Sequence, residues 1–158
     1  MAKRQQTLGE RRRRVGAAKA PVVRPVYPLL ALMFAGVWLA WPWFLLNEHL
    51  MKSDDLRRQA KVVALGLVGA AGIAAIVLAL VEAEVLGVRE ARYAYVLLVA
   101  WKIGISYVLE SRQGKSFSLW EYFGGQALNG LPIVLVARYL SGLIFEHLPF
   151  GLLWLVLR

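Results

Sequence analysis

Apolar residues gather in four long runs along the chain, separated by short polar segments. The runs cover residues 28–46, 62–82, 93–109 and 126–146. A helix rises 1.5 Å per residue, so about twenty apolar residues reach across the ~30 Å hydrocarbon layer of a membrane. The pattern therefore predicts an all-α, polytopic (multi-pass) integral membrane protein with four transmembrane helices.

Two polar linkers carry signals for the start of a helix. Ser53 is predicted to be the N-cap of the second helix, and Asp54 stands four residues before Arg58, a spacing that favours an ion pair. Ser118 followed by Glu121 forms a capping box, which predicts that the fourth helix begins there.

Small residues align on one face of the second run. Gly66, Ala70 and Ala74 recur at every fourth position, which lets another helix approach closely. We expect this face to pack inside the bundle or against a second copy of the chain.

Composition supports a membrane location. Hydrophobic residues make up 59% of the chain, its mean hydropathy is +0.54, and it has no cysteine. A soluble domain averages about half apolar residues. The lack of cysteine excludes disulfides and thiolate metal sites.

Basic residues are concentrated at the N-terminus. Residues 1–27 hold eight of the nineteen Lys and Arg residues and a single acidic residue. We predict that they form a disordered, basic cytoplasmic arm, with residues 28–158 forming the helical bundle. A run of four arginines is expected to contact the headgroups of an anionic leaflet; it consists of Arg11, Arg12, Arg13 and Arg14.

Four crossings would bring both ends of the chain to one side. That side would carry eleven Lys and Arg residues against six on the other, which predicts a protein of the inner (plasma) membrane with both termini cytoplasmic. Four basic residues in the linker after the first run weaken this bias. Because the basic residues outside the arm are divided between two sides, no surface for nucleic acid is expected.

The last apolar segment, residues 148–158, is too short to cross a membrane alone. We predict an interfacial or re-entrant piece. In the alternative register, residues 139–157 form a crossing with Glu146 and His147 at mid-depth, and Arg138 moves to the interface.

Two cations interrupt the apolar runs. Lys102 and Arg138 are each expected to cost at least about 2.5–3.5 kcal/mol at the bilayer centre unless they face protein or water. One hypothesis is an anion site in which Gln126, Asn129 and Ser141 supply further polar groups. The other is internal pairing with an acidic residue, for which the candidates are Glu82, Glu84, Glu110 and Glu146.

No catalytic, cofactor or metal pattern is present in the sequence. The two histidines, His49 and His147, stand on different linkers, and Ser141 faces away from His147 on a helix. We therefore expect a non-enzymatic component or regulator of a membrane complex, with a homo-oligomer or a membrane-protein partner. The alternative function is an oligomeric channel or transporter for an anionic solute that uses Lys102 and Arg138.

Overall fold

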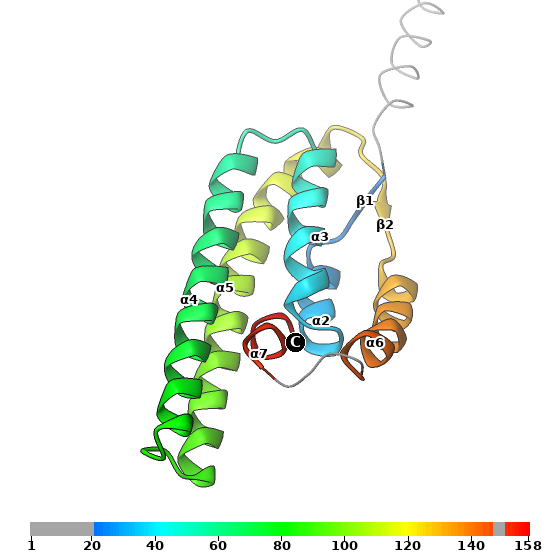
Figure 1. The fold of residues 1–158 in the computed structure, drawn as a ribbon. Coiled ribbons are helices and arrows are strands. Elements are labelled where there is room, and N and C mark those ends of the chain that lie inside the picture. Colours follow the sequence, from blue (N-terminus) through cyan, green and yellow to red (C-terminus); the bar gives the residue numbers. More distant parts are fainter. Residues whose placement is uncertain (1–20, 147–150) are drawn as a thin grey trace, which may run out of the picture.

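The computed structural model describes residues 21–146 and 151–158, and it is mostly helical (Figure 1). This confirms the all-α prediction. Its elements in chain order are β1 (Val22–Val23), α2 (Val26–Phe34), α3 (Val37–Leu50), α4 (Leu56–Glu82), α5 (Val88–Tyr122), β2 (Ala127–Leu128), α6 (Leu131–Glu146) and α7 (Leu152–Leu157).

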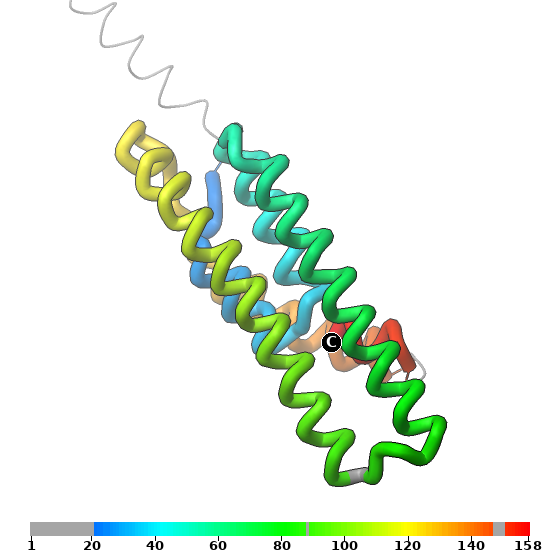
Figure 2. Tube along the Cα trace, turned by 90° about the vertical axis from the view of Figure 1, so that its left-hand side faces the viewer, coloured from blue at the N-terminus to red at the C-terminus, as the bar shows by residue number. Residues whose placement is uncertain are grey.

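Helices α4 and α5 form a long hairpin (Figures 1 and 2). They contain 27 and 35 residues, which corresponds to lengths of about 40 and 52 Å. In the described part of the chain, these two helices are long and apolar enough to cross a membrane. They include the predicted runs 62–82 and 93–109.

The small-residue face of α4 packs inside the bundle, as predicted. Gly66, Ala70 and Ala74 are buried, and Trp101 of α5 donates its indole N–H to the Gly66 carbonyl (3.1 Å). A Cβ at Gly69 would lie 2.4 Å from the Trp101 ring. The small residues on this side of α4, and the lack of a side chain at Gly66 and Gly69 in particular, therefore allow a tryptophan to lie across the helix.

The predicted first span is wrong as a single helix. The run 28–46 is divided between α2 and α3, and α3 runs back alongside α2 (Figures 1 and 2). The turn is at Gly36, whose φ of 102° and ψ of −175° suit glycine alone. A Cβ there would also lie 2.6 Å from the Leu157 carbonyl oxygen. Hydropathy alone did not reveal this turn.

The predicted start of the fourth helix is also wrong. Helix α5 continues through Ser118 to Tyr122, and the Ser118 hydroxyl donates to the Gly114 carbonyl (2.9 Å) instead of capping a helix. The helix continues because Gln113, Phe117 and Trp120 recur at helical spacing and are buried. Tertiary packing thus overrides the local capping signal.

A short parallel strand pair displaces the start of the last long helix. Val22 pairs with Ala127 and Val23 with Leu128. Residues 126–130 are therefore not helical, and α6 begins at Leu131 rather than 126. Val22 and Val23 are buried, so residues 22–27 belong to the fold rather than to the predicted arm. Residues 1–20, which include Arg11 to Arg14, lie outside the described residues.

The C-terminal segment forms the short helix α7, beside the turn at Gly36. Its six residues agree with the prediction of an apolar piece too short to cross. The alternative register is wrong, because α6 ends at Glu146 and α7 is a separate helix that follows Gly151. Residues 147–150, including His147, lie outside the described part of the chain.

Candidate functional sites

Lys102 lies inside the bundle. Its side chain is 4% exposed, and its ammonium donates a hydrogen bond to the backbone carbonyl of Leu155 in α7. The last carbonyls of a helix have no partner within the helix, and they favour a nearby cation. Lys102 therefore meets a helix end rather than any of the predicted glutamates.

Arg138 lies on α6, in a different environment. It is exposed and lines a cleft of about 630 Å³. We call this the α6 cleft; its polar lining residues are Tyr95, Arg138, Ser141, Glu146 and Arg158. The Arg158 guanidinium lies 4.9 Å from the centroid of the Trp154 ring.

The five residues predicted to form one polar site are not brought together. Arg138 and Ser141 share the α6 cleft, and the Ser141 hydroxyl donates to the Arg138 carbonyl (2.9 Å). Lys102 does not line this cleft. Gln126 and Asn129 flank β2, where the Asn129 side chain accepts a hydrogen bond from the Leu131 amide (3.0 Å).

A second polar site was not predicted from the sequence. It consists of Asn47 and Glu48 at the end of α3, Gln59 in α4 and Gln113 in α5, which are all 0–1% exposed. We call these four residues the polar cluster. They lie on three separate helices, so no local spacing connects them. The signal available in the sequence was the polar pair Asn47–Glu48, which begins the polar linker directly after the apolar run 28–46.

The amide groups of the polar cluster hold three helices and a strand together. Gln59 donates to Glu48 Oε2 (2.7 Å), and Gln113 donates to the Phe44 carbonyl (2.7 Å) and to Glu48 Oε2 (3.3 Å). Asn47 donates to the Val23 carbonyl of β1 (2.8 Å) and, at 3.4 Å, to Gln113. Buried hydrogen bonds of this kind fix the register between elements.

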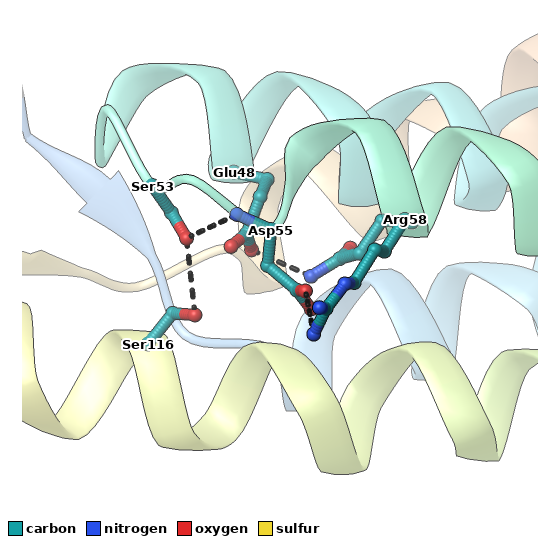
Figure 3. Close-up of polar contacts among 6 residues, drawn as sticks. Glu48, Ser53, Asp55, Arg58 and Ser116 are labelled. Carbon is teal, nitrogen blue, oxygen red and sulfur yellow. Dashed lines mark hydrogen bonds and ion pairs between the residues drawn. The ribbon is translucent and has the colours of Figure 1, made fainter.

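The connection between α3 and α4 lies next to this cluster (Figure 3). Ser53 Oγ accepts from the Asp55 amide (3.2 Å) and lies 3.4 Å from Ser116 Oγ of α5. The N-cap of α4 is Asp55 rather than the predicted Ser53. The ion pair also differs from the prediction, because Asp55, not Asp54, lies 3.8 Å from Arg58.

A second hollow lies between α4 and α5, towards their connecting turn. Its volume is about 710 Å³, and apart from Arg92 its lining is almost entirely apolar, with Trp154 and Leu155 of α7 at one side. Within residues 21–146 and 151–158, no group of three His, Asp or Glu side chains is arranged to hold a metal ion.

Comparison with protein-family models, with curated proteins and with solved structures found no match to this chain.

Proposed function

We propose that α4 and α5 cross the membrane, while the α2–α3 hairpin enters it from one side and returns to that side. Large apolar side chains on the outer faces of the long helices support this, because they are suited to lipid contact. Examples are Leu65 (59% exposed), Val68 (70%), Ile76 (62%) and Val96 (62%).

Charge supports the same arrangement. Seven of the described basic residues belong to the end of the bundle where α3 joins α4: Arg24, Lys52, Arg57, Arg58, Lys61, Arg112 and Lys115. The opposite end, at the α4–α5 turn, has Arg89 and Arg92. Seven further basic residues precede Pro21 in the sequence. The four-span scheme divides these groups, whereas a re-entrant hairpin collects them on one side, as the positive-inside rule favours.

We therefore propose that the α3–α4 end is cytoplasmic, in the plasma membrane. Its exposed cations would face anionic headgroups, at about 1 kcal/mol per residue near the surface. The end of α7 lies beside the Gly36 turn, which is inside the bilayer in this arrangement. The proposal therefore places the N-terminal arm on the cytoplasmic side of the membrane but assigns no side to the C-terminus.

Single cysteines test this topology directly, because the chain has none of its own. Ala17→Cys, Asp54→Cys and Ala83→Cys are labelled with a membrane-impermeant maleimide in intact cells and in inverted vesicles. The hairpin scheme predicts that positions 17 and 54 react from the same side and position 83 from the other. If positions 17 and 83 instead react from one side and position 54 reacts from the other, the result would support four membrane spans and contradict the hairpin scheme.

Within this arrangement, we propose that the protein is a non-catalytic component of a membrane complex. The α6 cleft carries the proposal. Arg138 and Glu146 line it, and among the described residues neither takes part in an ion pair. The cleft also borders the Gly36 turn, which lies within the bilayer in the proposed arrangement. Uncompensated charge at that depth is costly. We therefore expect a partner helix to occupy the cleft and to place a polar group against these charges.

Crosslinking at Gly142 tests for the partner. This glycine lines the α6 cleft, and a Cβ added to it meets nothing within 4 Å. Gly72 on α4 has equally open space and does not line the cleft. Gly142→Cys carrying a photocrosslinker is expected to form one discrete adduct in native membranes, with a second copy or with another membrane protein, and Gly72→Cys is not. Equal, diffuse labelling at both positions would contradict a docking face.

The second candidate function is passage of an anionic solute. It is favoured by the two guanidinium groups, Arg138 and Arg158, that line the same cleft. It predicts anion flux in liposomes that Arg138→Gln removes and Arg112→Gln, at the exposed cytoplasmic end, does not. Because Lys102 is buried against α7, Lys102→Met is not expected to change this flux. No flux across a broad anion panel would exclude the candidate.

A further inference from the structure

The polar cluster contains two buried oxygen atoms without a hydrogen-bond donor. They are Glu48 Oε1 and Gln59 Oε1, and both side chains are 0% exposed. The two residues already contact each other, since Gln59 Nε2 donates to Glu48 Oε2 (2.7 Å). Buried acceptors are rarely left without a donor in proteins, so this pair indicates a missing ligand.

The missing ligand must bring a hydrogen or a positive charge. The amide nitrogens of Asn47, Gln59 and Gln113 each donate at least one hydrogen bond, and the two atoms left without a partner are both acceptors. The charged and titratable side chains on the elements around Glu48 include, at this end of the bundle, Arg24, His49, Lys52, Asp54, Asp55, Arg57, Arg58, Lys61, Glu110, Arg112, Lys115 and Glu121. In the described part of the chain, only Asp55 and Arg58 form an ion pair, with each other.

Three ligands fit acceptors of this kind, and they differ in what they require. A water molecule donates hydrogen bonds but leaves the carboxylate charge uncompensated, at a cost of several kcal/mol in a buried site. A metal cation neutralises the charge but needs a coordination sphere of several oxygens. A proton neutralises the charge, supplies a donor and occupies no cavity.

We propose that Glu48 is a proton-binding site, with the proton on Oε1 and donated to Gln59 Oε1. The acid and the amide then form a reciprocal pair, because Gln59 Nε2 donates back to Glu48 Oε2. A proton taken up from the medium neutralises the carboxylate, and its release restores the buried anion. Both atoms without a donor are satisfied by this single ligand.

The site joins the hairpin to the long helices, so proton release has a structural consequence. Glu48 lies in the last turn of α3, Gln59 lies in the first turn of α4, and Gln113 lies on α5. A buried anion at this joint favours conformations in which α3 separates from α4 and α5 and water reaches the carboxylate. Since the folded form binds the extra proton, its stability falls as the pH rises.

Glu48→Gln tests the proposal, because glutamine has the shape of the protonated acid and its amide can donate to Gln59 in the same way. In the full chain in lipid nanodiscs, the wild-type melting temperature is expected to fall as the pH is raised. Glu48→Gln is expected to melt at the wild-type temperature at low pH and to lose this pH dependence. Asp54→Asn, a matched change at an exposed carboxyl, should keep the wild-type profile.

Infrared spectroscopy gives an independent measurement. Over the pH range in which the wild type keeps its full melting temperature, it should show the carbonyl band of a protonated carboxyl group, and Glu48→Gln should lack it. Gln59→Leu, which removes the proposed acceptor of the proton, should shift the band. This second variant tests the proposal even if Glu48→Gln fails to fold. The proposal is overturned if no such band is present in the folded wild type, as expected with bound water alone. It is equally overturned if sodium or potassium raises the melting temperature of the wild type but not of Glu48→Gln.

Discussion

Gly36→Ala is the change that most directly tests the α2–α3 hairpin. In the structure, Gly36 has a φ of 102° and a ψ of −175°, a region of backbone space that costs other residues of order 1–3 kcal/mol. A Cβ would also lie 2.6 Å from the Leu157 carbonyl oxygen and 2.7 Å from that of Arg158. Both are backbone atoms, so neither can rotate away.

The two effects add, because one concerns the turn itself and the other its contact with α7. Forced displacement of packed groups costs typically 1–3 kcal/mol, so the total is roughly 2–6 kcal/mol. Against a typical stability of about 5–15 kcal/mol, this is a large loss. For a chain of this size it corresponds to a fall in melting temperature of at least about 4 °C.

The assay is thermal unfolding in detergent or nanodiscs, followed by near-UV circular dichroism of the tryptophans. Gly142→Ala is the control, because it lies within a helix and its Cβ meets nothing within 4 Å; it should stabilise by about 0.5–1 kcal/mol. A continuous helix over 28–46 would make Gly36→Ala stabilising as well. A rise in the melting temperature of Gly36→Ala would therefore refute the hairpin. The sign of the change is enough to distinguish the two structures.

Three further substitutions examine single contacts. Ser106→Ala removes the acceptor of the buried Trp41 indole N–H (2.8 Å) and should cost about 1–3 kcal/mol in denaturant unfolding, whereas Ser111→Ala, at an exposed position, should not. Ser118→Ala should change stability by less than about 0.5 kcal/mol, because Ser118 lies within α5; a loss near 1 kcal/mol would favour the capping box. Lys102→Met should speed hydrogen exchange in α7 by removing the donor to Leu155, and unchanged exchange there would contradict this contact.

The parts of the fold that were predicted correctly depend on long-range periodicity. The helices over 62–82 and 93–109 were found because a sustained apolar run of that length has few alternatives to a helix. The buried face of Gly66, Ala70 and Ala74 was found for the same reason, since i, i+4 spacing defines a helix face whatever packs on it. Both features are properties of one segment alone.

The features that were missed depend on contacts between distant segments. An apolar run of nineteen residues has the same hydropathy whether it crosses a membrane or folds into two half-length helices. Contacts with distant segments, such as the approach of Leu157 to Gly36, distinguish the two. The burial of Glu48 was likewise not predicted, because its partners Gln59 and Gln113 follow 11 and 65 residues later. No local rule connects these positions.

The short helix α7 also explains why an ammonium group stands in the middle of an apolar run. In the proposed arrangement α7 ends inside the bilayer, where water cannot satisfy its last carbonyls and each unsatisfied group costs several kcal/mol. A helix that crosses completely leaves its ends in water and needs no such donor. Lys102 supplies the donor from α5, at the C-terminal end of α7 where a positive charge is favoured. The cost of burying one cation is thus offset by a helix end that requires it, and α7 and Lys102 are expected to be lost or retained together.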